Sequence, residues 1–127
     1  MKIYNSKEAN SFPDAILFDT DNTLYPYDLS HLAAMNEVER KVVRTFSITS
    51  KDFSRAYDEA RQDIKGRLKG TASSHSRLLY MQRMLEIMGL GSQVLVALDL
   101  EQTYWSTCLN SAVLFDGDKE LLDDIWI

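Results

Sequence analysis

The chain has 127 residues, of which 45% are hydrophobic, with 14 basic and 19 acidic side chains and a formal charge of −5. This length and composition fit a single globular domain and exclude disordered, collagen-like and coiled-coil classes. The acidic balance argues against nucleic acid as a partner, because no net basic field attracts the phosphate backbone. The longest purely apolar run, residues 94–98, is too short to span a membrane, which takes about 20 residues.

The cysteine content and the start of the chain bear on the compartment. Cys108 has no second cysteine with which to form an internal disulfide, and this favours a reducing compartment. Residues 1–8 lack the apolar core of a secretory signal. We therefore expect a soluble, cytoplasmic protein.

The first predicted element is a strand at residues 15–18. Residues 12–14, Phe-Pro-Asp, form a turn-like lead-in, and the following Ala-Ile-Leu-Phe is apolar throughout. A short apolar run bounded by polar residues is typical of a strand buried on both faces of a parallel sheet. The polar cluster of residues 19–23 follows directly, and Pro26 then favours a loop.

Residues 30–109 carry apolar side chains at helical spacing, which predicts four helices. Thr49 and Asp52 have the spacing of a capping box and mark the start of the second helix, which Gly70 ends. The buried stripe predicted for the first helix consists of Leu32, Met35, Val38, Val42 and Phe46.

The third helix is predicted to open near Ser73 or Ser74 and to stop at Gly89. The fourth, residues 93–109, is apolar nearly all round, so we expect it to be the most buried helix of a bundle. A further short helix is predicted for residues 119–127.

Two carboxylates, Asp19 and Asp21, follow directly after the predicted strand. In open α/β sheets ligands bind beyond the carboxyl ends of strands, and side chains two residues apart can turn to the same side. Close carboxylates repel, so a divalent cation or a shared proton is needed between them. One then serves as nucleophile and metal ligand while the other exchanges a proton, as phosphoryl transfer through an aspartyl-phosphate requires. The structural alternative is a solvated turn, because Asp, Asn and Thr are good turn residues.

Residues 15–24, Ala-Ile-Leu-Phe-Asp-Thr-Asp-Asn-Thr-Leu, resemble the first motif of the haloacid dehalogenase (HAD) superfamily, an aspartate, any residue, an aspartate and then a threonine. In members with a helical cap, the cap is inserted soon after this strand, and residues 30–109 have a suitable length and character. Residues 114–122 resemble the segment by which such proteins return to the core. The resemblance therefore covers nearly the whole chain.

This resemblance implies an α/β fold that is mostly helical by residue count. Residues 1–28 and 110–127 would form an incomplete HAD-like, Rossmannoid core, and residues 29–109 the inserted helical-bundle cap. The core is expected to be incomplete, because the single strand at residues 15–18 cannot satisfy its own backbone hydrogen-bonding groups.

Carried over from the family, Asp19 would be the nucleophile and a Mg²⁺ ligand. Asp21 would be the general acid and base, with its backbone carbonyl also on the metal. The backbone amides around Thr20 and Asp21 would face the phosphate, and Thr23 would brace the loop. Mg²⁺ suits such a site, because it prefers oxygen ligands and keeps several waters. The implied function is a Mg²⁺-dependent phosphohydrolase acting on a small phosphorylated metabolite, such as a nucleotide or a sugar phosphate.

The hinge between the second and third predicted helices supplies two further candidates, His75 and Arg77. Either side chain could reach toward the leaving group of the substrate. The structural alternative is a helix cap with solvated side chains, because serine caps helices readily.

The family's three later motifs, a Ser/Thr, a Lys and an acidic pair, have no convincing match in the chain. We interpret the sequence as the front half of such a hydrolase, either truncated or naturally short. The isolated chain is then expected to be a very poor phosphatase, because phosphoryl transfer depends on an assembled set of charges. The alternative function is a non-catalytic helical module that pairs with another chain or with its own copy through an exposed strand edge.

Overall fold

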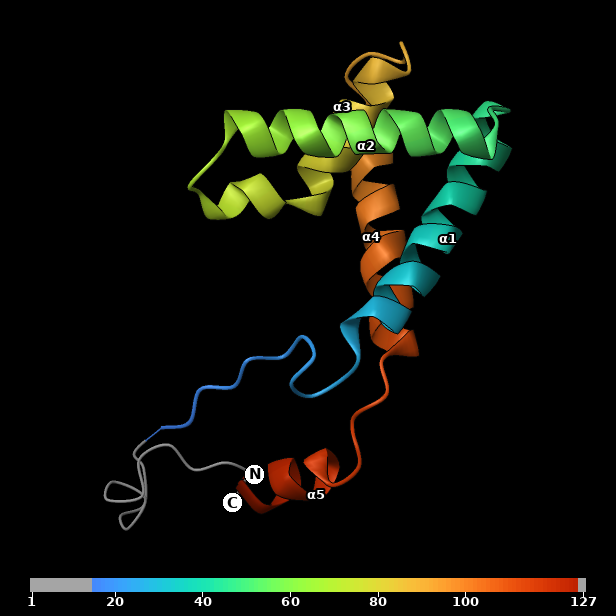
Figure 1. The fold of residues 1–127 in the computed structure, drawn as a ribbon. Coiled ribbons are helices and arrows are strands. Elements are labelled where there is room, and N and C mark those ends of the chain that lie inside the picture. Colours follow the sequence, from blue (N-terminus) through green and yellow to red (C-terminus); the bar gives the residue numbers. More distant parts are fainter. Residues whose placement is uncertain (1–14, 126–127) are drawn as a thin grey trace.

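The structure is a computed structural model and describes residues 15–125. Helices make up 71% of these residues. They are α1 (Tyr27–Phe46), α2 (Ser50–Arg67), the short 3₁₀-helix η1 (Ala72–His75), α3 (Arg77–Ile87), α4 (Val94–Ser111) and α5 (Asp118–Ile125). α1 and α4 pack side by side, α3 packs against both α2 and α4, and α2 lies across one end of the bundle (Figure 1). α5 stands at the end opposite to α2 (Figure 1), and the Phe115 N–H in the segment before it donates to the Leu24 carbonyl at 3.0 Å.

The hydrophobic core lies where α3 meets its neighbours. Four of its side chains have no exposed surface at all, namely Tyr80, Met81, Met84 and Leu85. α1 adds Ala34, Val38 and Val42, which are spaced four residues apart and so share one face of the helix. Burial of this apolar surface is the main favourable contribution to the stability of the bundle.

The limits of the predicted helices are largely confirmed, with shifts at their starts. α1 begins at Tyr27, three residues before the predicted start. In its stripe Val38 and Val42 are buried as predicted, but Leu32 is 58% exposed, and Ser30 is buried instead. α3 begins at Arg77 rather than near Ser73 or Ser74, because the 3₁₀-helix η1 occupies that segment.

Two local sequence signals, one at the start of α2 and one at the end of α3, have the predicted effect. The Thr49 hydroxyl accepts from the backbone N–H of Asp52 at 3.1 Å and donates to the Asp52 carboxylate at 2.7 Å, which caps α2. Gly89 follows α3 with φ of 78°, and the next amide, Leu90 N–H, donates to the carbonyl of Leu85 at 3.0 Å. A left-handed glycine in this position closes the last turn of a helix.

α4 differs from the prediction, because it is not the most buried helix. Its buried residues are Ala97, Leu100, Tyr104 and Cys108. Its opposite flank leaves four large apolar side chains exposed, Leu95, Leu98, Trp105 and Leu109. α3 is the more buried helix for its length, because four of its 11 residues are buried, compared with four of the 18 residues of α4.

The predicted α/β fold is wrong for this chain. Residues 15–125 contain no strand and no sheet, and one isolated bridge, between Asp21 and Tyr25, is the sole β-type pairing among them. The run at residues 15–18 is exposed, and Leu17 retains its full solvent-accessible surface. A strand forms only when a neighbouring strand accepts its hydrogen bonds, and no second strand lies beside this run in the described part. An apolar pattern alone therefore does not make a Rossmann-like core.

The predicted turn, the predicted domains and the predicted helix near residue 120 have different outcomes. The turn predicted at residues 12–14 lies outside the described residues, and the division into core and cap stays a prediction. The short helix predicted near the end is present as α5.

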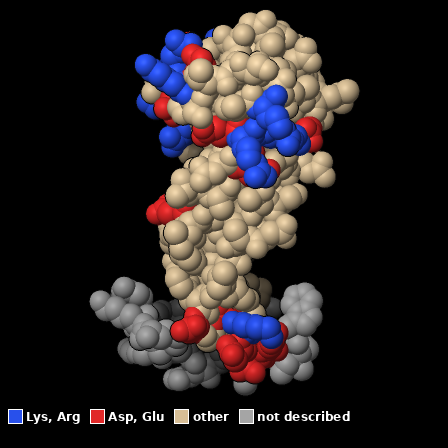
Figure 2. Space-filling view, turned by 90° about the vertical axis from the view of Figure 1, so that its right-hand side faces the viewer, with Lys and Arg blue, Asp and Glu red and all other residues tan. Residues whose placement is uncertain are grey.

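No helix in residues 15–125 combines the length and the hydrophobicity that a membrane span requires. Figure 2 shows charged side chains gathered toward the two ends of one face, with a long, mostly uncharged stretch between them.

Candidate functional site

The loop that carries Asp19 and Asp21 is held by two side-chain hydrogen bonds. The Thr23 hydroxyl donates to Oδ2 of Asp19 at 2.9 Å. The Tyr25 hydroxyl donates to Oδ1 of Asp21 at 2.6 Å. Each carboxylate is thus oriented by a hydroxyl group four residues later in the chain. Thr23 braces this loop as predicted, whereas the contribution of Tyr25 was not predicted.

The backbone of the loop forms a tight turn that is attached to α1. The Leu24 N–H donates to the Thr20 carbonyl at 2.9 Å, and the Asn22 N–H donates to the Tyr25 carbonyl at 2.9 Å. Asn22 has a φ of 58°, a left-handed conformation that Asn adopts more readily than most residues. Its side-chain oxygen accepts from the N–H of Tyr27 at 3.0 Å, which satisfies a free donor at the start of α1. The side chain of Asn22 therefore attaches the loop to the first turn of α1.

The electrostatics of the loop favour a protonated Tyr25. Its hydrogen bond to the Asp21 carboxylate, together with burial, raises the pKa of Tyr25 to about 12. The phenol therefore remains a donor at neutral pH and keeps one oxygen of Asp21 occupied. Among the described residues, Oδ1 of Asp19 and Oδ2 of Asp21 receive no hydrogen bond. Both aspartates are exposed, so one oxygen of each carboxylate is open to a ligand.

The carboxylate oxygens of this loop are of the kind that magnesium prefers as ligands. Mg²⁺ is usually held by one or two carboxylates, with waters and phosphate oxygens completing the octahedron. Asp19 and Asp21 supply two exposed carboxylates on one short loop. Residues 15–125 contain no group of three or more His, Cys, Asp or Glu side chains placed to hold a metal. The loop thus falls short of a complete set of protein ligands, and a magnesium site here stays a prediction.

The predicted hinge residues, His75 and Arg77, have different environments. His75 is exposed at the end of η1. Arg77 is half-buried, and its Nη2 donates to the Tyr27 hydroxyl at 2.7 Å. Its guanidinium carbon lies 5.1 Å from the centre of the Tyr104 ring, in cation–π geometry. The structural alternative, a solvated side chain beside a serine cap, therefore describes His75 but not Arg77.

Arg77 belongs to a cluster that the sequence analysis missed. The rings of Tyr27 and His31 are stacked with their centres 5.2 Å apart, and Nδ1 of His31 lies 2.7 Å from the Tyr104 hydroxyl. Burial and the positive charge of Arg77 lower the pKa of His31, so the imidazole is neutral at pH 7. The four-residue spacing of Tyr27 and His31 was a signal for a shared helix face, but Tyr104 comes from α4 and only folding places it there.

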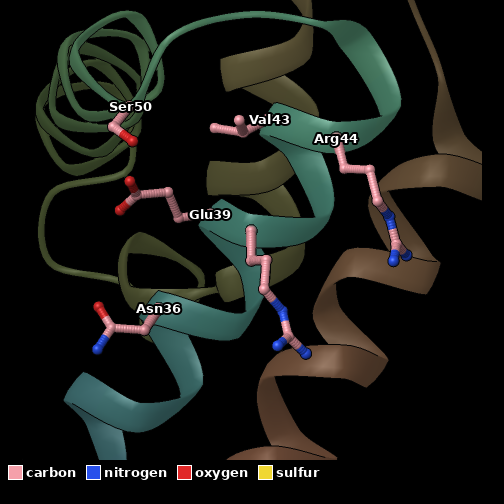
Figure 3. A pocket seen from close by; sticks show the side chains of 6 residues that line it. Asn36, Glu39, Val43, Arg44 and Ser50 are labelled. Atoms are coloured by element: carbon pink, nitrogen blue, oxygen red, sulfur yellow. The ribbon is translucent and has the colours of Figure 1, made fainter.

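A separate hollow of about 440 Å³ lies along α1 at the start of α2. In Figure 3, Glu39 points toward Ser50, whereas Arg44 points to the other side of the helix. The complete lining is Asn36, Glu39, Arg40, Val43, Arg44 and Ser50. None of the predicted site residues lines this hollow, so we do not place the functional site there.

Comparison with known proteins gives one informative relative. The chain is 36% identical over 112 residues to a protein from Halopiger xanaduensis named ribulose-1,5-bisphosphate 5-phosphatase. The aligned region covers 87% of this chain and 47% of that protein, so the chain spans about half the length of this relative. No family model and no solved structure matches the chain. The name of the relative is that of a phosphatase, which is the class of enzyme predicted from the sequence.

Proposed function

We propose that this chain contributes to a phosphatase that hydrolyses a phosphate ester of a small sugar phosphate. The observation that carries the proposal is the braced pair of carboxylates, Asp19 and Asp21, in a chain similar to a protein named as a phosphatase. The alignment covers 87% of the chain, so fewer residues lie outside it than the number that precede Asp19. The loop that begins at Asp19 is therefore part of the aligned region. The name of the relative describes a sugar that carries two phosphates, and we extend that substrate class to this chain.

In the proposed reaction Asp19 is the nucleophile. An oxygen of its carboxylate attacks phosphorus, the bond from phosphorus to the sugar oxygen breaks, and an aspartyl-phosphate forms. Asp21 acts as the general acid and gives a proton to the departing sugar oxygen. A water molecule then attacks the aspartyl-phosphate, Asp21 takes the proton of that water, and Asp19 and inorganic phosphate are released. These are the roles that HAD-type hydrolases assign to the two aspartates of this motif.

Other parts of the loop orient the reacting groups. Thr23 holds one oxygen of Asp19, so the other oxygen is the one presented to phosphorus. The backbone N–H groups of Thr20 and Asp21 are not used within the turn, which leaves them available to the phosphate. A Mg²⁺ ion held by Asp19 and by the Asp21 carbonyl would offset the charge on the phosphate oxygens. The proposal concerns this motif and its chemistry, and it does not depend on a Rossmann-like core in this chain.

The test measures phosphate release from an aryl phosphate and from ribulose 1,5-bisphosphate with magnesium present. We expect slow hydrolysis by the wild-type chain, because the loop supplies only part of the charge that phosphoryl transfer requires. Asp19→Asn is expected to abolish it. Asp116→Asn is the matched control, since Asp116 is also exposed and makes no hydrogen bond to the described residues, and its rate should equal that of the wild type. Either no hydrolysis by the wild-type chain or an equal rate in Asp19→Asn contradicts the proposal.

A second candidate function is association with another copy of the chain, and the exposed flank of α4 favours it. Its apolar side chains alternate at spacings of three and four residues, at Leu95, Leu98, Trp105 and Leu109, with Gln102 completing the seam. Such a seam is typical of a helix that packs against a second helix. Around Gln102 the seam is self-complementary for an antiparallel pair of α4 helices. Sedimentation of the chain as a monomer at high concentration would exclude this function.

A further inference from the structure

Arg77 is a partly buried cation with an incomplete set of partners. Its Nη2 donates to the neutral hydroxyl of Tyr27, and its Nε is buried without a hydrogen-bond partner. In the described part of the chain no carboxylate lies within ion-pair distance of its guanidinium. Arg83 on the same helix shows the contrast, because Asp63 and Glu86 both bind it, at 2.6 and 2.9 Å.

Burying the Arg77 charge in this arrangement costs free energy unless an anion binds the guanidinium. Removing a charge from water disfavours the folded state, and the neutral hydroxyls of Tyr27 and Tyr104 do not supply a counter-charge. The rings of Tyr80 and Tyr104 lie 5.7 and 5.1 Å from the guanidinium carbon, so they lower this cost through cation–π contact. The Tyr104 hydroxyl also accepts a hydrogen bond from the guanidinium, but Nε stays buried without a partner, and such a donor calls for an explanation. A planar guanidinium with free donors matches the oxygens of a phosphate.

The position of Arg77 relates it to the aspartate loop. Its partner Tyr27 lies two residues after Tyr25, whose hydroxyl holds Asp21. Tyr27, His31 and Arg77 are all half-buried, so the cluster keeps an open side.

We infer that Arg77, with the Tyr27 hydroxyl and the His31 ring, binds a phosphate group of the substrate other than the one that reacts at Asp19. This inference rests on the proposed function and assigns a second subsite to it. The bound phosphate accepts from the guanidinium in place of the Tyr27 hydroxyl. The released hydroxyl then donates to a phosphate oxygen, so each polar group exchanges a neutral partner for a charged one. Arg77 is thus a specificity-determining residue that selects sugars with two anionic groups.

The experiment is a titration of the chain with inorganic phosphate, followed by NMR at the Arg77 Nε–H and at the His31 ring. In the wild type we expect both signals to shift together and to saturate. Arg77→Gln should weaken binding at least tenfold. Arg77→Lys keeps the charge but loses the planar fork, so it should weaken binding severalfold while preserving the fold, as checked by circular dichroism. The matched control is Arg83→Gln, which should leave phosphate affinity unchanged.

Several outcomes would overturn the inference. These are shifts confined to the loop at residues 19–25, equal affinity in wild type and Arg77→Lys, and an equal loss of affinity in Arg83→Gln. Asp19→Asn separates the two proposals, because it should abolish hydrolysis while phosphate still shifts the His31 ring. Phosphate binding at Arg77 in a chain that hydrolyses nothing would remove the proposed function and leave an anion site.

Discussion

The hydrogen bond of Tyr80 allows a test of how the hinge before α3 is held. The ring of Tyr80 has no exposed surface, and its hydroxyl donates to the carbonyl of Ser74 at 2.5 Å. Ser74 is itself 6% exposed and lies in η1, the segment that leads into Arg77. Tyr80→Phe removes one oxygen atom and leaves the packing of the ring in place. The buried carbonyl of Ser74 then has no donor in the described part of the chain.

The size of the effect follows from that unsatisfied carbonyl. A buried acceptor without a partner costs about 1–3 kcal/mol, so we expect the free energy of unfolding to fall by about 2 kcal/mol. For a domain of this size the midpoint of thermal unfolding should fall by roughly 4 °C for each kcal/mol. The measurement is urea unfolding followed by helical circular dichroism, with the slope against urea unchanged.

Tyr57→Phe is the matched control for this prediction. Tyr57 is 8% exposed and stacks on Phe53, but its hydroxyl makes no hydrogen bond with the described residues. Its removal should change stability by less than about 0.5 kcal/mol. If Tyr80→Phe and Tyr57→Phe unfold at the same urea concentration, the hydroxyl of Tyr80 does not hold η1, and the reasoning is refuted.

Two further predictions concern the cap of α2 and the response to pH. Thr49→Ala removes the acceptor for the Asp52 N–H, so it should destabilise the chain by about 1 kcal/mol in the same urea assay, and Thr49→Ser should restore most of that loss. Because burial lowers the pKa of His31 below its ordinary 6.5, the unfolded state binds more protons than the folded state between the two pKa values. Stability should therefore be constant above about pH 7 and fall as the pH drops below 6.5. His31→Gln should flatten this decline in urea midpoints measured between about pH 5 and pH 7, and an unchanged decline would exclude His31 as its source.

The loop at residues 19–25 shows how far the site could be predicted. Asp19, Asp21 and Thr23 stand close together in the sequence, so a motif identifies them before folding is known. Thr23 was predicted to brace the loop, and its contact with Asp19, four residues away, comes from the structure. The contact of Tyr25 with Asp21 was not predicted, because it depends on the left-handed turn at Asn22.

The Arg77 cluster was beyond the reach of the sequence. Arg77 and Tyr27 are 50 residues apart, and His31 and Tyr104 are 73 residues apart. The sequence pointed to Arg77 as a candidate, but no pattern indicated that its neighbours are two tyrosines and a histidine rather than a carboxylate. Those neighbours are set by how α1, α3 and α4 pack, and a periodicity does not encode that packing.

The sequence by itself determined where most helices begin and end and which short motif carries the two acids. Caps at Thr49 and Gly89 act over three to five residues, so local chemistry decides them. Tertiary structure decided that residues 15–18 stay extended without a sheet, that α3 rather than α4 is the most buried helix for its length, and that Arg77 lacks a counter-charge among the described residues. These outcomes depend on partners distant in the chain, because a strand, a buried face and an ion pair each need a second surface to be complete.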